Sequence, residues 1–149
     1  MEKLTQKWCI AAFFDDLEEG FEFNRSEYPL HITVAGVFDI DKTGKEIYEL
    51  LTELLKNQKP FIVSAGDDVL WGEYKDLRVV IIDNSIEMSD LVMRIYNKLE
   101  LEGVEFYQPE YEGAGHILHS TVQKSGRLNK GQKVVINKLS LVDMFPNSD

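Results

Sequence analysis

Residues 30–55 read LHITVAGVFDIDKTGKEIYELLTELL and join a strand pattern to a helix pattern. The first part, 30–38, is a short apolar run typical of a β-strand. Thr43 and Glu46 then have the spacing of a capping box, so we expect a helix to begin near Thr43 and to end before Pro60. Between them, apolar residues recur at the spacing of a single helix face: Ile47, Leu50, Leu51, Leu54 and Leu55.

The same order of patterns recurs further along the chain. A second apolar helix face is formed by Met88, Leu91, Val92, Ile95 and Leu99, with a cap at Asn84 and a stop at Gly103. The remaining apolar runs predict strands at 8–14, 61–65 with 68–71, 77–82, 117–123 and 133–143. The resulting order is a unit of two strands and one helix, which occurs twice and is followed by two more strands. This doubled unit predicts an α+β fold with mostly antiparallel sheets.

Composition excludes several classes of protein. The 149 residues suit one domain, 1–149, and no GxGxxG or GxxxxGK[ST] loop occurs, so nucleotide binding by those loops has no support. Cys9 is the one cysteine, which excludes an intrachain disulfide and a zinc site built on cysteines. The longest apolar run, 8–14, is too short to span a bilayer, and the N-terminus has no signal-peptide pattern. We therefore expect a cytoplasmic protein with no membrane partner.

Two of the three histidines open the same short pattern. His31 begins His-Ile-Thr-Val, and His119 begins His-Ser-Thr-Val, 88 residues later. Both patterns fall in predicted strands, where residues i and i+2 point to one face. Each pattern therefore presents an imidazole and a hydroxyl side by side: His31 with Thr33, and His119 with Thr121.

These residue types suit acid/base chemistry on a phosphodiester. An imidazole takes or gives a proton near neutral pH, so two of them can serve as base for the attacking oxygen and acid for the leaving oxygen. Threonine hydroxyls can donate hydrogen bonds to the non-bridging oxygens, where charge builds up in the transition state. This scheme requires neither a metal nor another cofactor.

The charge distribution agrees with a phosphate ligand. The chain has a formal net charge of -10, which disfavours long duplex nucleic acid. Residues 113–142 nevertheless contain no Asp or Glu and hold five basic residues: Lys124, Arg127, Lys130, Lys133 and Lys138. We expect Lys124 and Arg127 to contact phosphate. Lys130 and Lys133 are weaker candidates, because the sequence NKGQK at 129–133 is typical of a turn.

The paired H-x-T-apolar motifs, one in each half of the chain, resemble those of the two-histidine (2H) phosphoesterase superfamily. This superfamily includes bacterial 2'-5' RNA ligase-like proteins and cyclic phosphodiesterases. The resemblance implies a bilobal α+β fold with two pseudo-symmetric halves, each with a packed helix, and a cleft between the lobes. It also implies that His31 and His119 are the acid/base pair and that Thr33 and Thr121 bind phosphate oxygens. The implied substrates are 2',3'-cyclic phosphates or 2'-5' linkages of nucleotides or RNA ends.

Two other interpretations stay open. The motif flanks differ from those of many bacterial relatives, with VAGVF at 34–38 and Leu118 before the second histidine. A non-catalytic module that binds nucleotides or RNA ends is therefore the alternative. A third interpretation is an interaction protein in which the motifs are coincidental.

A few other side chains are candidates for the site. Tyr107, Trp71 and Phe106 could stack on a base, although such residues more often belong to a core. His116 and His119 form H-x-x-H, but no third ligand is evident, so we predict no metal site.

Overall fold

The computed structural model describes residues 7–14, 30–71, 77–83, 86–107, 109, 112, 119–123 and 127–144. Within these residues the chain forms, in order, β1 (Lys7–Phe13), β2 (His31–Asp39), α1 (Gly44–Leu54), β3 (Phe61–Trp71), β4 (Leu77–Asp83), α2 (Ile86–Leu101), β5 (Glu105–Phe106), β6 (His119–Thr121), β7 (Lys133–Ile136) and β8 (Ser140–Met144). The cap predicted at Asn84 lies outside the described residues.

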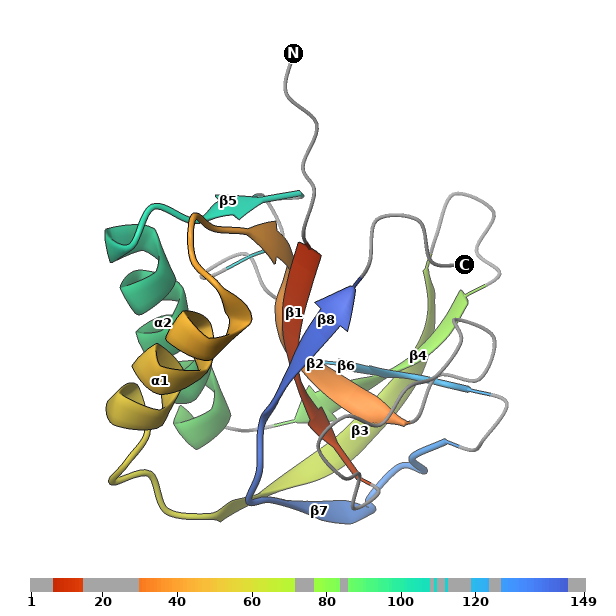
Figure 1. Cartoon of the computed structure of the whole chain (residues 1–149). Coiled ribbons are helices and arrows are strands. Elements are labelled where there is room, and N and C mark those ends of the chain that lie inside the picture. Colours follow the sequence, from red (N-terminus) through yellow and green to blue (C-terminus); the bar gives the residue numbers. More distant parts are fainter. Residues whose placement is uncertain are drawn as a thin grey trace.

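The described strands form two antiparallel four-stranded sheets (Figure 1). The first sheet has the order β5-β2-β1-β8, and the second has the order β6-β4-β3-β7. Each sheet is centred on an antiparallel pair that precedes a helix: β1 and β2 before α1, β3 and β4 before α2. The outer strands of both sheets come from the chain after α2. The predicted α+β class and the doubled unit are thus confirmed.

Both helices form where the sequence pattern predicts them. The Thr43 hydroxyl accepts a hydrogen bond from the Glu46 N–H at 3.2 Å, and the Glu46 carboxylate accepts one from the Thr43 N–H at 2.8 Å, so the capping box is confirmed. The predicted apolar face of α2 is buried along its whole length. Gly103 follows α2 with a φ of 86°, a left-handed conformation that glycine adopts without strain.

The two helices lie next to each other on one side of the molecule (Figure 1). Lys42, which precedes α1, forms an ion pair of 3.0 Å with Glu102, which follows α2. At Gly44 of α1, an added Cβ would lie 2.7 Å from the Trp8 ring of β1, and α2 contacts β2. Each half of the chain thus supplies one helix, as expected, although both helices lie on the same side of the molecule. The physical reason is that the apolar faces of both helices enter one shared core.

That core is one contiguous cluster with contributions from both sheets and both helices. β2 provides Ile32, Val34 and Phe38, and β4 provides Val80 and Ile82. Ile32, Phe38 and Val80 have no solvent exposure. One face of each sheet therefore packs in this core, and the other face points away from it.

Two strand predictions need correction, and one strand was not predicted. The run 133–143 is two strands in different sheets, β7 and β8, separated by residues 137–139. The runs 61–65 and 68–71 are one strand, β3, with a register shift against β4 between Ala65 and Asp68. β5 has no counterpart among the predicted strands.

Neither α1 nor α2, the helices of the described residues, is long and apolar enough to cross a membrane.

Candidate functional site

The first motif lies at the start of β2. His31 and Thr33 are half-buried, whereas Ile32 and Val34 between and after them are buried in the core. This alternation places the imidazole and the hydroxyl on the same face of the strand, as predicted. Across the sheet, His31 is paired with Phe13 of β1, and Thr33 is paired with Ala11.

The second motif forms the whole of β6 and shows the same alternation. His119 and Thr121 are half-buried, and Ser120 between them is 1% exposed. In the register with β4, His119 is opposite Ile81, Thr121 is opposite Val79, and Ser120 is opposite Val80. Val80 belongs to the core cluster, so His119 and Thr121 lie on the face of the sheet away from the core.

The first motif lies on the corresponding face of its own sheet. Ile32 and Val34 belong to the core cluster, whereas Ala11, opposite Thr33, is buried but does not belong to it. Val79, opposite Thr121, is likewise buried outside the cluster. Both His-Thr pairs are therefore displayed on sheet faces that the main core does not use.

The fold brings the two motif strands together although they belong to different sheets. Cα atoms of β2 and β6 approach within 8 Å of each other. Figure 1 shows the two strands crossing near the middle of the molecule. Two segments that are 88 residues apart in the chain are thus neighbours in space.

Each motif histidine contacts an aromatic ring. The centroids of the His31 and Phe13 rings are 5.4 Å apart, with the planes tilted by 48°. The centroids of the His119 and Trp71 rings are 4.6 Å apart, in an edge-to-face arrangement at 63°. Such contacts restrict the orientation of an imidazole. Trp71 was a candidate from sequence, but Phe13 was missed, because only the β1–β2 register reveals its position opposite His31.

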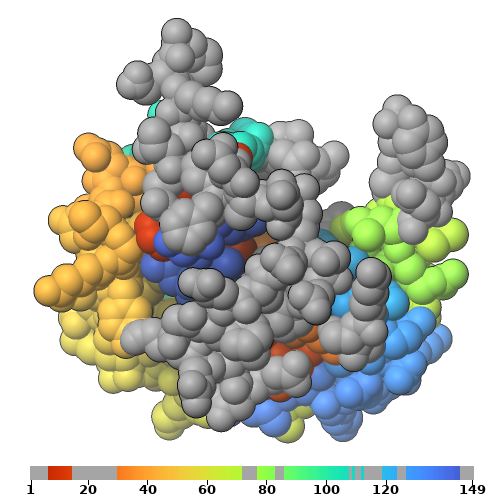
Figure 2. All heavy atoms as spheres, turned by 45° about the vertical axis from the view of Figure 1, so that its right-hand side comes forward, coloured from red at the N-terminus to blue at the C-terminus, as the bar shows by residue number. Residues whose placement is uncertain are grey.

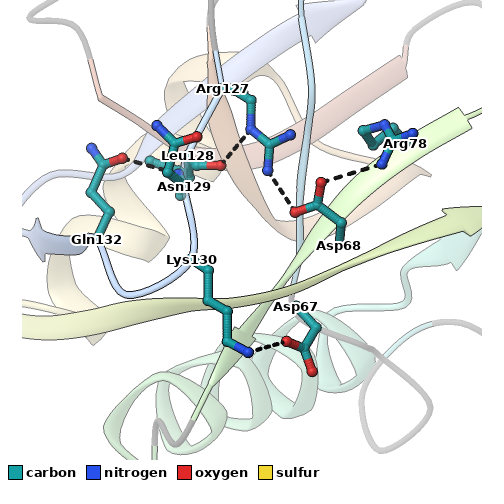
Figure 3. Close-up of polar contacts among 8 residues, drawn as sticks. All are labelled: Asp67, Asp68, Arg78, Arg127, Leu128, Asn129, Lys130 and Gln132. Carbon is teal, nitrogen blue, oxygen red and sulfur yellow. Dashed lines mark hydrogen bonds and ion pairs between the residues drawn. The ribbon is translucent and has the colours of Figure 1, made fainter.

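Arg127 is placed differently from the prediction. Its guanidinium forms an ion pair of 2.5 Å with Asp68 and donates a hydrogen bond to the Leu128 carbonyl (Figure 3). Arg78 binds the other carboxylate oxygen of Asp68 at 3.3 Å. These two guanidinium groups hold the pKa of Asp68 below its usual range, and the hydrogen bond from Arg127 has the largest effect.

The Asp68 cluster lies on the other face of the second sheet from His119. Asp68 is opposite Val80 in the register, and Val80 is opposite Ser120 of the core face. Lys130 is also paired, with Asp67 at 2.8 Å (Figure 3). Arg127 and Lys130 thus have acidic partners from β3, and Arg127 is not directed to the histidines.

The other predicted ligand-binding residues do not gather at the motifs. The N–H of Tyr107 donates a hydrogen bond to Val37, near the opposite end of β2, about 20 Å along the strand from His31. The Phe106 ring packs against the rings of Phe38 and Tyr96, away from the two motifs. Lys124 and His116 lie outside the described residues.

No three His, Cys, Asp or Glu side chains in the described part of the chain are grouped as a metal site would need. A scan against models of known protein families finds no match to this chain. A search of curated proteins also finds no match.

Proposed function

We propose that this protein is a phosphodiesterase that acts on 2',3'-cyclic phosphates or 2'-5' linkages of nucleotides or RNA ends by two-histidine acid/base catalysis. One observation carries the proposal: two H-x-T strands from separate sheets approach within 8 Å, and each displays its imidazole and hydroxyl away from the core. In this proposal, the space between the two sheets at β2 and β6 is the substrate cleft of a 2H phosphoesterase.

The chemical step uses both histidines. One imidazole takes a proton from water as the water oxygen forms a bond to phosphorus. The bond from phosphorus to one ribose oxygen breaks, and the other imidazole gives that oxygen a proton. Thr33 and Thr121 donate hydrogen bonds to the non-bridging oxygens as their negative charge grows. The near-equivalent positions of the two motifs leave the direction of attack to the orientation of the substrate.

The aromatic contacts support this assignment. A general acid or base works only when its nitrogen is within hydrogen-bond reach of the proton that it transfers. Phe13 of the first sheet contacts the His31 ring, and Trp71 of the second sheet contacts the His119 ring, so each imidazole has an aromatic neighbour that restricts its orientation. The formal charge of -10 favours a small ligand or a short RNA end over long duplex contacts.

The test is turnover of a panel of 2',3'-cyclic nucleotides and 2'-5'-linked dinucleotides in EDTA across pH. We expect a bell-shaped pH profile and losses of about 10²- to 10⁴-fold in His31→Ala and in His119→Ala. Thr33→Val and Thr121→Val remove only the hydroxyl, and Thr33→Ser and Thr121→Ser are the matched controls that keep it. The valine variants should lose about 10²-fold more activity than the serine variants.

Full activity in either alanine variant would contradict the mechanism. If the native protein shows no turnover but binds these ligands, and the alanine variants still bind them, the non-catalytic module is the better interpretation. Circular dichroism of each variant must show a retained fold, since both histidines lie in strands.

A further inference from the structure

The face of the second sheet that carries His119 extends across the sheet to β7. His119 is opposite Ile81 of β4, and Ser64 of β3 is opposite both Asp83 of β4 and Lys133 of β7. Residues 81 and 83 share a face because they are two positions apart on a strand. The extra residue between Ala65 and Asp68 lies on β3, so it does not disturb this relation. Lys133 therefore lies on the same face as His119, in the strand farthest from it.

Burial confirms this assignment of faces. Val63 and Ile82, the neighbours of Ser64 and Ile81 on their strands, are buried in the core cluster. Lys133 is exposed, and Ile62 and Val135, which are opposite each other beside it, are 57% and 54% exposed. Figure 2 shows blue residues of the 119–144 part of the chain at the surface, next to green residues of β4.

Lys133 differs in electrostatic environment from its basic neighbours in the sequence. Arg127 and Lys130 are held by Asp68 and Asp67, whereas Lys133 forms no ion pair with any residue that the structure describes. Its ammonium group can therefore bind an anion without first breaking a described contact. Beside it, Ile62 and Val135 form an apolar surface on which a ribose or a base can rest.

We propose that Lys133 binds a second phosphate of a substrate longer than one nucleotide, which runs across the second sheet from β6 to β7. This inference rests on the proposed function. Three strand spacings separate β6 from β7, about 14 Å, so Lys133 acts on a different phosphate from the one at the histidines. The site thereby prefers short single-stranded RNA ends to free cyclic mononucleotides.

The experiment compares two substrates: a cyclic mononucleotide, and a single-stranded tetraribonucleotide that ends in a 2',3'-cyclic phosphate. Lys133→Gln should lower kcat/KM for the tetranucleotide about 10-fold, and this loss should be at least about fivefold larger than the loss for the mononucleotide. The slope of log kcat/KM against log salt for the tetranucleotide should become less steep by about 0.7, the value for one phosphate contact to a single strand. Lys130→Gln is the matched control, because it removes the same charge three positions away from a lysine already paired with Asp67.

Equal losses for the two substrates, or equal effects of Lys130→Gln and Lys133→Gln, would overturn the inference. A second measurement distinguishes failure of this inference from failure of the proposed function. It is the binding of the same tetranucleotide, labelled at its 5' end, measured by fluorescence anisotropy. If no substrate is turned over but Lys133→Gln alone weakens binding about 10-fold, the subsite stands and the catalytic proposal fails. If the native protein turns over both substrates and Lys133→Gln has no selective effect, only the subsite fails. Absence of binding would overturn both.

Discussion

The same four-residue pattern occurs in two strands with very different structural support. β2 has nine residues, pairs with β1 on one side and with β5 on the other, and fills its core face with Ile32, Val34 and Phe38. β6 has three residues, and its described pairing is with β4. The same short pattern is thus found on two strands that differ in length and in the number of neighbouring strands.

The residue between the histidine and the threonine of each motif, which points into the core, shows the difference most clearly. In the first motif it is Ile32, an apolar side chain that has no solvent exposure. In the second motif it is Ser120, whose hydroxyl is buried and has no hydrogen-bond partner among the described residues. β6 is also held by contacts around it, including a hydrogen bond of 3.0 Å from the Val122 N–H to the Arg78 carbonyl. We therefore expect mutations in β2 to lower the free energy of unfolding, and mutations around β6 to change mainly the position of its motif side chains.

The largest effect should follow from Ile32→Ala. Removing a fully buried isoleucine leaves a cavity in the shared core, so we expect a loss of about 2–5 kcal/mol in the free energy of unfolding. Urea denaturation followed by circular dichroism measures this loss. Ile62→Ala is the matched control, since Ile62 is 57% exposed and its truncation should change stability by less than about 1 kcal/mol. Similar losses in both variants would contradict the assignment of faces.

A smaller effect, on catalysis, should separate the two aromatic contacts. Trp71→Leu removes the edge-to-face partner of His119, and Phe13→Leu removes the partner of His31. An aromatic pair contributes about 0.5–1.5 kcal/mol, which corresponds to a loss of about 2- to 10-fold in kcat. We expect Trp71→Leu to approach the upper limit, because β6 is short, and Phe13→Leu the lower limit. Steady-state kinetics on any active substrate of the panel decides the order, and a greater loss in Phe13→Leu would reverse the comparison.

Truncation of Ser120, on the core face of β6, should hardly change the free energy of unfolding. Ser120→Ala removes a buried hydroxyl without a described partner, so we expect stability to be unchanged or raised by up to about 1 kcal/mol. The measurement is again urea denaturation, alongside Ile32→Ala. A loss above about 1.5 kcal/mol would show that the hydroxyl has a partner and that β6 is better supported than its described contacts indicate.

A comparably small effect, which depends on pH, concerns the ion pairs that attach the chain after β6 to β3. The folded-state pKa of Asp68 is lowered, chiefly by the hydrogen bond from Arg127, so its carboxylate contributes stability above the usual pKa of 3.8. This contribution is lost as the pH falls through the lowered pKa. Asp68→Asn should therefore destabilise the protein at pH 7, and the difference from the native protein should shrink below about pH 3.8.

Thermal unfolding of Asp68→Asn across pH provides the data, with Glu53→Gln as the control. Glu53 pairs with Lys56 on the exposed surface of α1, where such a pair contributes little. A pH-independent difference between Asp68→Asn and the native protein would show that the carboxylate charge is not the cause.

Local patterns in the sequence predicted the parts of the structure that depend on near neighbours. The Thr43–Glu46 capping box, the apolar face of α2 and the stop at Gly103 all involve residues a few positions apart. The same holds for the shared face of His31 and Thr33, because the period of a strand is two residues.

Long-range pairing explains the predictions that differ from the structure. The apolar run 133–143 has no local signal that assigns β7 to one sheet and β8 to the other. Arg127 looked free in the sequence because Asp68, its partner, is 59 residues away. Tyr107 is near His119 in the chain, but its hydrogen bond to Val37 holds it at the other end of β2.

By itself, the sequence determined the class of fold, the two helices and the composition of the two H-x-T motifs, since these follow from short-range periodicity and residue chemistry. Only the tertiary structure decided that β2 and β6 become neighbours, that Arg127 is paired on the core face and that Lys133 shares a face with His119. The physical reason is that strand register and sheet order arise from pairing between distant segments. Periodicity assigns a residue to one of the two faces of its strand, but only pairing with other strands determines which residues share that face.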